Sequence, residues 1–246
     1  MTEQRVAIVT GGARGIGAAI TTALARSGVH VAAGYSSNRT AADDLAAELT
    51  ADGCSVSVHQ GNVGKPEDCE RVVAEVLEAK GRVDHLVNNA GITVDKTMRR
   101  MTVDDWHAVL RINLSGAFYM TKSVLDHMTG NGFGRIVNIS SVIGQTGNIG
   151  QVNYAASKSG LFGFTTSLAR ETANKGVTVN CVAPGYVETE MVAAVPEAAM
   201  AKILAKIPVG RLGQAHEIAR AVQFLVDDGA GYITGSVISV NGGMDM

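Results

Sequence analysis

The sequence predicts an α/β fold: one doubly wound, mainly parallel sheet of about seven strands, with helices on both faces. Two observations carry this prediction. Short apolar runs alternate with longer amphipathic runs along almost all of the 246 residues, which is the pattern of a parallel sheet covered by helices. A glycine-rich loop follows the first apolar run directly, and such a loop is typical of the first strand-to-helix turn in this fold class.

The strands are expected where short apolar runs stand between turn residues. Strands of a parallel sheet are buried on both faces, so they read as nearly continuous apolar segments rather than as alternating ones. In chain order the expected strands are Val6–Thr10, His30–Gly34, Val56–Gln60, His85–Asn88, Arg135–Ser140, Thr178–Val182 and Val237–Val240.

The helices are expected in the amphipathic segments between these strands. Pro66-Glu-Asp is a favourable first turn, because proline needs no N–H partner there and acidic side chains complement the helix dipole. Ser27-Gly28 and Lys175-Gly176 carry the glycine that commonly ends a helix. In chain order the expected helices are Ile16–Ser27, Ala41–Ala51, Pro66–Ala79, Val103–Met128, Tyr154–Asn174, Glu197–Lys206 and Ala215–Val226.

No repeat, low-complexity tract or linker interrupts this alternation, so residues 1–246 are expected to form a single dinucleotide-binding catalytic domain. The least regular stretch is Gly185–Gly210, where Pro184, Pro196 and Pro208 surround a short alanine-rich segment. A long insertion within a compact domain is usually a lid or a binding loop. We interpret residues 185–210 as a substrate lid, and a plain surface excursion is the alternative.

Composition excludes several functional classes. The chain is 46% hydrophobic and 18% charged, as in soluble globular proteins. Its formal net charge is −2 and it has no basic cluster, which argues against a nucleic-acid surface. No apolar run approaches the roughly 18 residues of a membrane span, and the N-terminus lacks a signal-peptide pattern. We therefore expect a cytoplasmic protein without nucleic-acid or membrane partners.

The cysteines and histidines do not predict a metal site. Cys54, Cys69 and Cys181 are widely spaced and odd in number, which fits neither a disulfide framework nor a zinc site. They are interpreted as buried or incidental thiols in a reducing compartment. The six histidines form no His-x-x-x-His or similar ligand pair.

A phosphate-binding loop is predicted directly after the first strand. The segment Gly11-Gly-Ala-Arg-Gly15-Ile-Gly17 lies between that strand and a helix-forming run. Glycines permit a tight turn and let backbone amides approach a phosphate, while the helix N-terminus supplies partial positive charge. The spacing differs from the standard Gly-x-Gly-x-x-Gly. Its position between strand and helix nevertheless favours a dinucleotide site of the Rossmann type.

A phenol, an amine and a hydroxyl are expected to converge on one carbonyl group. In a helix, Tyr154 and Lys158 lie one turn apart on the same face. A phenol titrates near ~10 in water, and a cation within roughly 4–6 Å lowers that pKa toward a useful range. Ser141 follows a buried strand, at the sheet edge where ligands bind. The alternative for Tyr154 and Lys158 alone is a surface pair without chemistry.

Taken in order, the motifs resemble the short-chain dehydrogenase/reductase family over essentially the whole chain. Within it, the chain resembles the 3-oxoacyl-[acyl-carrier-protein] reductases of fatty acid synthesis and the acetoacetyl-CoA reductases of polyhydroxybutyrate synthesis. The segments that carry the resemblance are Thr10-Gly-Gly-Ala-Arg-Gly-Ile-Gly17, Asn88-Asn-Ala-Gly91, Asn113, Ser141, Tyr154-x-x-x-Lys158, Pro184-Gly185 and Asn241-Gly-Gly-Met244. The narrower match rests on Asn89-Ala-Gly-Ile-Thr93, Arg135-Ile-Val-Asn-Ile-Ser-Ser141, Gly150-Gln-Val-Asn-Tyr154 and Gly185-Tyr-Val-Glu-Thr189.

The resemblance implies NADPH-dependent reduction of a 3-oxoacyl thioester to the 3-hydroxyacyl thioester. Tyr154 would donate the proton and Ser141 would hydrogen-bond the carbonyl oxygen. Lys158 would hold the nicotinamide ribose and lower the pKa of Tyr154, and Asn113 would support a water path to Lys158. Ser140 competes for the carbonyl position, but the thirteen-residue spacing to Tyr154 favours Ser141. An asparagine in a helical run can also be an ordinary packing residue.

The residues after the second strand favour NADPH over NADH. NAD-binding proteins place an acid there for the ribose 2′-hydroxyl, whereas an arginine accommodates a 2′-phosphate. No acid occurs before Asp43, while Ser36, Ser37 and Arg39 offer donors and Arg14 adds a second cation. For Arg39 the alternative is a solvated residue at a helix start.

The resemblance also implies an adenine pocket at Asn62-Val63, where many relatives have Asp in place of Asn62. It further implies a segment under the cofactor at residues 89–91 and a nicotinamide-facing turn at residues 184–189. The expected cofactor contacts are Gly11, Arg14, Gly15, Ile16, Gly17, Tyr35, Ser36, Arg39, Asn62, Val63, Asn89, Ala90, Gly91, Tyr154, Lys158, Pro184, Gly185, Val187 and Thr189.

Substrate contacts are expected from loop positions at the mouth of the site, namely Asp95, Gln145, Asn148, Gln151, Tyr186 and Met191. A carrier-protein partner would prefer a basic rim. Lys175 stands where carrier-protein reductases often carry a basic residue, but Gly132 stands where they can carry another. The absence of a basic residue at position 132 favours a CoA thioester.

Two other functions stay open at this point. One is a short-chain enzyme acting on an unrelated ketone or secondary alcohol, and the other is a catalytically silent dinucleotide-binding module. The family usually assembles as tetramers through its two longest helices. The lengths of Val103–Met128 and Tyr154–Asn174 are consistent with a homotetramer, because each helix has a second face to bury.

Overall fold

A computed structural model describes residues 4–189 and 197–245 of the chain. Its seven-stranded sheet has the order β3-β2-β1-β4-β5-β6-β7, and every pair of neighbouring strands is parallel. The predicted strands are all present, with ends that shift by one or two residues. They are β1 (Val6–Val9), β2 (His30–Tyr35), β3 (Val56–Gln60), β4 (His85–Asn88), β5 (Gly134–Ile139), β6 (Val177–Pro184) and β7 (Val237–Val240).

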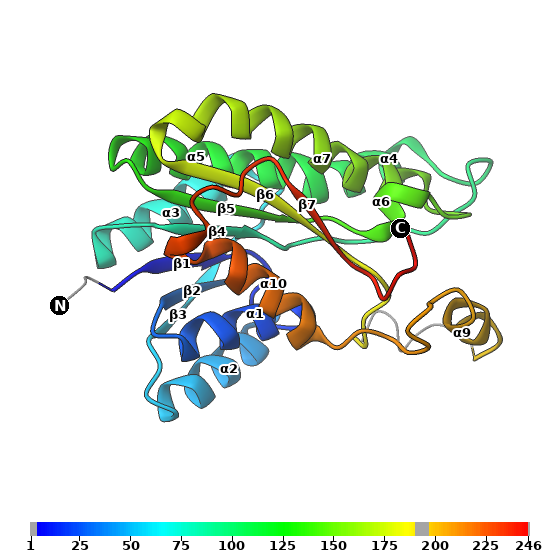
Figure 1. Cartoon of the computed structure of the whole chain (residues 1–246), viewed down its shortest axis with the longest axis horizontal. Helices are drawn as coiled ribbons and strands as arrows, with labels where there is room; N and C mark the ends of the chain where they lie inside the picture. Colours follow the sequence, from blue (N-terminus) through cyan, green and yellow to red (C-terminus); the bar gives the residue numbers. More distant parts are fainter. Residues whose placement is uncertain (1–3, 190–196, 246) are drawn as a thin grey trace.

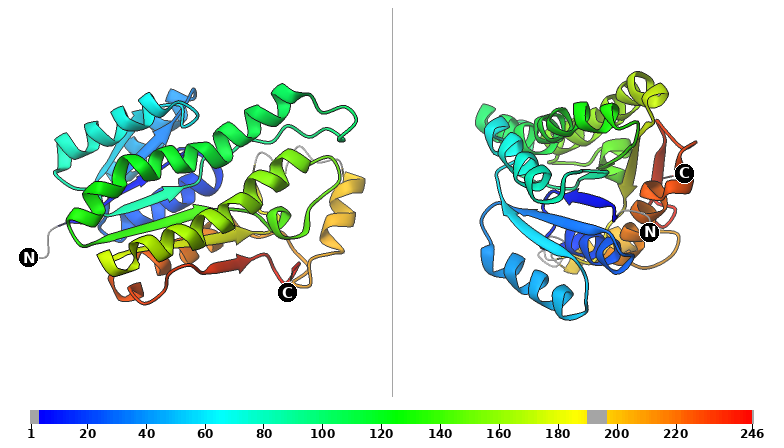
Figure 2. Two further views of the ribbon diagram at one scale, coloured as in Figure 1. Left: turned by 90° about the horizontal axis from the view of Figure 1, so that it is seen from above. Right: turned by 90° about the vertical axis from the view of Figure 1, so that its left-hand side faces the viewer.

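Helices cover both faces of the sheet, so the predicted fold class is confirmed (Figures 1 and 2). Below it in Figure 1 lie α1 (Gly15–Arg26), α2 (Arg39–Ala51) and α10 (Ala215–Val226). Above it lie α3 (Pro66–Lys80), α4 (Val103–Leu110), α5 (Gly116–Gly130) and α7 (Val152–Thr172). Shorter segments are α6 (Val142–Thr146), α9 (Glu197–Leu204), the π-helix η1 (Arg111–Ser115) and the 3₁₀ turns η2 (Ala173–Lys175) and η3 (Asp228–Ala230).

Each face of the sheet has its own apolar core. Leu24 of α1 and Leu225 of α10 belong to one cluster of buried side chains. Val76 of α3 and Met128 of α5 belong to the cluster on the other face. A fully buried side chain of this kind contributes roughly 1.5–3 kcal/mol to the free energy of folding. Burial on both faces explains why the strands read as continuous apolar runs. None of the described helices combines the length and apolar character needed to cross a bilayer.

The predicted continuous helix Val103–Met128 is wrong in its middle. The structure has α4, then one π-helical turn over Arg111–Ser115, then α5. A π-turn places one more residue in the turn than an α-helix does, and such turns are frequent at functional sites. Periodicity does not show this insertion, because the apolar pattern continues through it. A second element that the sequence analysis missed is α6, which begins directly after Ser141.

The strand order reverses between β1 and β4. The chain runs from β1 outward to β3 and then returns to add β4 on the other side of β1. Parallel α/β sheets bind ligands at the carboxyl ends of the strands where such a reversal occurs. The fold therefore places the functional site after β1 and β4.

Candidate active site

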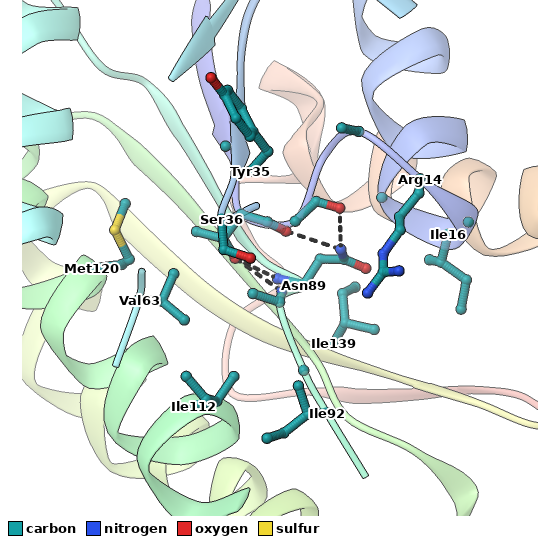
Figure 3. A pocket seen from close by; sticks show the side chains of 18 of the residues that line it. Arg14, Ile16, Tyr35, Ser36, Val63, Asn89, Ile92, Ile112, Met120 and Ile139 are labelled. Atoms are coloured by element: carbon teal, nitrogen blue, oxygen red, sulfur yellow. Dashed lines mark hydrogen bonds between the residues drawn. The ribbon is translucent and has the colours of Figure 1, made fainter. Parts of the chain in front are cut away.

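A cleft of about 830 Å³ opens at the carboxyl ends of the strands, next to this reversal. Most of the predicted site residues line it, although they come from loops far apart in the sequence. They are Gly11, Arg14, Gly15, Ile16, Gly17, Tyr35, Ser36, Asn62, Val63, Asn89, Ala90, Gly91, Ser141, Tyr154, Lys158, Pro184, Gly185, Val187 and Thr189. Figure 3 shows part of this cleft, with Arg14 and Ile16 on one side and Val63 and Ile112 on the other.

The loop after β1 has the properties of a phosphate site. Helix α1 begins at Gly15, and the residue that caps it, Arg14, makes no side-chain hydrogen bond to the first turn. The first backbone N–H groups of α1 are thus without a side-chain cap and can serve an anion. A β-carbon on Gly17 would lie 2.0 Å from the Gly11 carbonyl oxygen, so only glycine permits this fold of the loop. The cleft therefore fits the diphosphate of a dinucleotide.

Asn89 joins the loop after β4 to the loop after β1. Its Nδ2 donates to the carbonyl oxygens of Thr10 at 2.9 Å and Gly11 at 3.1 Å, as Figure 3 shows. The Thr10 hydroxyl in turn accepts from the backbone N–H groups of Asn89 and Ala90, both at 3.0 Å. These bonds connect the two strands between which the sheet reverses. Asn89 thus helps to hold the floor of the cleft in place.

Tyr154 lies in the first turns of α7, which is anchored from two directions. The fully buried Asn153 donates through Nδ2 to the carbonyl oxygen of Val94 at 3.1 Å, and its Oδ1 accepts from the Tyr154 N–H at 2.8 Å. The Ser141 side chain lies close enough to the Tyr154 phenol to act to lower its pKa. Burial has the larger effect, and the pKa of Tyr154 is raised above its usual value.

Lys158 lies one turn after Tyr154 and is only 4% exposed. Its Nζ lies 5.7 Å from the centroid of the Tyr154 ring and donates to the Ile139 carbonyl oxygen at 2.7 Å. Burial lowers the pKa of Lys158 to about 8. The sequence-based expectation was that Lys158 would lower the pKa of Tyr154. The structure differs from it, because burial disfavours the charged form of both groups.

Asn113 occupies the centre of the π-turn and is 2% exposed. Its Oδ1 accepts from the Ile92 N–H at 2.8 Å, and its Nδ2 donates to the Ile92 carbonyl oxygen at 3.0 Å and to Ser157 Oγ at 3.1 Å. Asn113 does not itself line the cleft. A β-carbon on Gly91 would lie 3.4 Å from both Asn113 Oδ1 and Lys158 Nζ. The Asn113 amide oxygen and the Lys158 amine therefore lie close to one another beside Gly91.

The structure distinguishes the two neighbouring serines. The Ser140 hydroxyl donates to the backbone carbonyl oxygen of Lys158 at 2.8 Å, a contact that holds β5 to α7. Ser141 caps α6, where its Oγ accepts from the Ile143 N–H at 3.1 Å, and it is the serine that contacts Tyr154. Of the two hydroxyls, that of Ser141 is placed to act together with the phenol.

Arg39 lies outside the cleft. Its Nε is 3.1 Å from the Asp43 carboxylate, one helical turn further along α2, and the side chain is exposed. This arrangement matches the alternative of a solvated residue at a helix start.

The five predicted substrate residues that the structure describes are not among those that line the cleft. Three of them form an exposed chain, in which Gln151 Nε2 donates to Asp95 at 3.0 Å and Asn148 Nδ2 donates to Gln151 at 2.8 Å. Gln145 donates to Ser239 Oγ at 3.1 Å. Tyr186 lies near Asp95, since both burial and that carboxylate raise the pKa of Tyr186. The sixth predicted residue, Met191, lies outside the described residues.

Several residues that line the cleft were not predicted. Arg111 and Ile112 come from the π-turn, Ile92 follows Gly91, and His59 lies in β3. The motif at residues 88–91 could have pointed to Ile92 as the next residue along the same loop. No local signal marks the other three, because their positions depend on how α4 and η1 pack against the loop after β3. Within the described residues, no three His, Cys, Asp or Glu side chains are placed to hold a metal ion.

Comparison with known proteins shows extensive similarity. The model of the short chain dehydrogenase family matches residues 5–199. The acetoacetyl-CoA reductase of Shinella zoogloeoides is 52% identical over 240 residues, covering 97% of this chain and 98% of the relative. That of Rhizobium meliloti is 50% identical over 240 residues, with the same coverage. The 3-oxoacyl-[acyl-carrier-protein] reductase of Salmonella typhimurium is 47% identical over 244 residues, covering 99% of this chain and 98% of the relative.

Proposed function

The chain belongs to the short-chain dehydrogenase family, and from this premise we propose that it reduces a 3-oxoacyl thioester to the 3-hydroxyacyl thioester with NADPH. The observation that carries the proposal is the meeting of Ser141, Tyr154 and Lys158 in a cleft whose glycine loop suits a dinucleotide. The substrate class is supported by the relatives, which are acetoacetyl-CoA reductases and a 3-oxoacyl-[acyl-carrier-protein] reductase.

The proposed chemistry adds a hydride to the ketone carbon and a proton to its oxygen. When bound, the reduced nicotinamide supplies the hydride. Ser141 donates a hydrogen bond to the carbonyl oxygen, where negative charge develops in the transition state and preorganised donors contribute most. Tyr154 then gives its phenolic proton to that oxygen. A pKa raised by burial suits this role, because the phenol stays protonated near neutrality.

Lys158 and Asn113 are proposed to return a proton to Tyr154. Lys158 has a pKa of about 8 and can exchange protons near neutrality. Lys158 Nζ and Asn113 Oδ1 lie close to one another beside Gly91, and a water molecule that accepts from the amine and donates to the amide oxygen would connect them. The cleft residues that would hold the cofactor are the glycine loop, Asn89 to Gly91 and the turn from Pro184 to Thr189.

NADPH is proposed over NADH because of the residues at the end of β2. Arg14, Ser36 and Ser37 line the cleft beside the glycine loop, whereas no carboxylate follows β2 before Asp43. A 2′-phosphate is recognised by cations and hydroxyl donors of this kind, while an acid at this position would favour NADH. Arg39 contributes less to this proposal, because Asp43 already pairs with it.

Two further proposals concern the oligomeric state of the enzyme and the role of residues 185–210. We propose a homotetramer that buries the outer faces of α4, α5 and α7, where the large side chains Val103, Phe118 and Val152 are exposed. We also propose that residues 185–210 act as the substrate lid. One end of this segment is held by the Glu188 N–H, which donates to the Gly213 carbonyl oxygen at 2.9 Å.

The test is a set of initial rates with acetoacetyl-CoA and a 3-oxoacyl carrier-protein thioester, each with NADPH and with NADH. We expect turnover of at least one thioester with a clear preference for NADPH. Activity on an unrelated ketone without activity on any 3-oxoacyl thioester would contradict the substrate class. Binding of NADPH without turnover of any carbonyl compound would leave a silent dinucleotide-binding module.

A further inference from the structure

Arg111 is a positively charged residue at the cleft that has no role in the proposed reaction or in the proposed cofactor contacts. It is the first residue of the π-turn η1, it is exposed, and it lines the cleft. Within residues 4–189 and 197–245, its guanidinium has neither an ion pair nor a hydrogen bond. Arg39, by contrast, is paired with Asp43 outside the cleft. The predicted Arg39 therefore lies outside the cleft, whereas Arg111, which lies far from it in the sequence, lines the cleft.

The stem of Arg111 lies against the turn that follows β3. A β-carbon on Gly64 would lie 3.2 Å from Arg111 Cγ and 2.8 Å from Ile112 Cδ1, so η1 and this turn are in close contact. The turn itself is held by the Gly64 N–H, which donates to Asn62 Oδ1 at 2.9 Å. The contact between η1 and the turn after β3 therefore fixes the backbone position from which the Arg111 side chain extends.

This part of the cleft suits a flat apolar group. Val63, Ala108 and Ile112 line it with aliphatic side chains. It lies across the cleft from Arg14, as the positions of Val63 and Ile112 in Figure 3 show. A dinucleotide that binds its diphosphate at the N-terminus of α1 and its reactive ring beside Tyr154 must place its other base elsewhere in the cleft. The aliphatic wall of Val63, Ala108 and Ile112 beside Arg111 gives this base an apolar surface to lie against.

We propose that Arg111 binds the purine of the dinucleotide by laying its guanidinium over the face of the base, against the wall of Val63 and Ile112. The inference rests on the proposed function, since it assumes the same cofactor. A planar guanidinium stacks on aromatic faces and is weakly hydrated, which a lysine ammonium is not. Because the purine is common to NADPH and NADH, Arg111 adds affinity for both and does not choose between them.

The experiment measures binding by isothermal titration calorimetry with 2′,5′-ADP and 5′-AMP, which carry the purine but no nicotinamide. We expect Arg111→Ala to weaken both probes about threefold to tenfold. Arg111→Lys keeps the charge but not the plane, and it should weaken both as well. Arg14→Ala should weaken 2′,5′-ADP much more than 5′-AMP. The control is Arg220→Ala, an exposed arginine of α10 outside the cleft, which should bind both probes as the unaltered chain does.

Three results would overturn the assignment. The first is that Arg111→Ala binds both probes with full affinity. The second is that Arg111→Ala loses affinity for 2′,5′-ADP alone. The third is that Arg111→Lys keeps full affinity, which would mean that a point charge suffices. Thermal melting of each variant shows that the fold is retained. An unaltered chain that binds neither probe would instead contradict the proposed cofactor, so the two failures are distinguishable.

Discussion

The two ends of the cleft region are built differently. At the catalytic end, Ser141, Lys158 and Asn113 are at most 8% exposed. Each of these side chains has a hydrogen-bond partner in the fold. In the region of the predicted substrate contacts, Asp95 is exposed and Gln151 is half-buried, and the two side chains are in contact with each other. The catalytic side chains are thus held in place by the folded core, whereas the predicted substrate residues are held mainly by hydrogen bonds to one another.

This difference suggests how the protein divides its tasks. Groups that stabilise developing charge must be in place before the reaction, because reorganisation during the reaction would cost the energy they supply. Burial provides that order, although it also disfavours the charge on Lys158. Exposed polar groups can adapt to substrates of different length at a smaller energetic cost. Substitutions at the two ends should therefore differ in size and in the kinetic constant that they change.

The largest effect is expected at the phenol. Tyr154→Phe removes the proposed proton donor and leaves the ring in place, so kcat should fall by about 10³-fold. The dissociation constant for NADPH should stay within about twofold, because the ring still lines the cleft. Stopped-flow turnover and fluorescence titration of NADPH measure the two quantities. A variant that keeps more than about a tenth of the rate would contradict the proton-donor role.

A matched pair of serine variants separates chemistry from packing. Ser141→Ala removes a donor to the developing oxyanion, and kcat should fall by about 10²-fold. Ser140→Ala removes the bond to the Lys158 carbonyl oxygen, which should lower the free energy of unfolding by about 1 kcal/mol and kcat by less than about threefold. Steady-state kinetics and urea denaturation provide both values. Equal losses of kcat would mean that the two hydroxyls are not distinguished as the structure indicates.

Lys158 should make stability depend on pH in the alkaline range. The pKa of Lys158 in the folded chain is about 8, below the ordinary lysine value of 10.5, so the unfolded chain binds the extra proton between these two values. The free energy of unfolding should rise with pH across that window, by on the order of 3 kcal/mol. Lys158→Met lacks this amine, so its free energy of unfolding should rise less between pH 7 and pH 10 than that of the unaltered chain. Urea denaturation at the two pH values measures both rises. A difference between the two proteins that does not change with pH would refute the buried amine.

Arg14 tests an exposed charge beside the cleft. Arg14→Ala should raise the dissociation constant for NADPH about tenfold, in line with the loss of one charge-assisted bond to a phosphate. Binding of NADH should change by less than about twofold, because NADH has no 2′-phosphate. Titration with each nucleotide gives the ratio. An equal loss for both would argue against recognition of the 2′-phosphate by Arg14.

The smallest effect is expected at the mouth. Gln151→Ala removes the amide that connects Asp95 with Asn148, and an exposed bond of this kind contributes little. The KM for the thioester should rise about twofold to threefold with kcat nearly unchanged. A large fall in kcat would instead mean that Gln151 acts in the chemical step, which would contradict the difference between the two regions.

The sequence alone determined the parts of the protein that depend on local periodicity. The seven strands follow from apolar runs, and the glycine loop follows from its place between a strand and a helix. The spacing of Tyr154 and Lys158 follows from the helical repeat, which puts both on one face. Each of these features is set by residues that are close together in the chain, so one stretch of sequence contains all the information.

Only the tertiary structure decided which distant segments meet. It placed Arg111 at the wall of the cleft and Arg39 outside it, and it placed Asn113 in a π-turn where a continuous helix was expected. It also raised the pKa of Tyr154, because the effect of burial outweighs that of the nearby Ser141 side chain. Burial and contacts between loops are sums over the whole folded chain, and no single stretch of the sequence carries them.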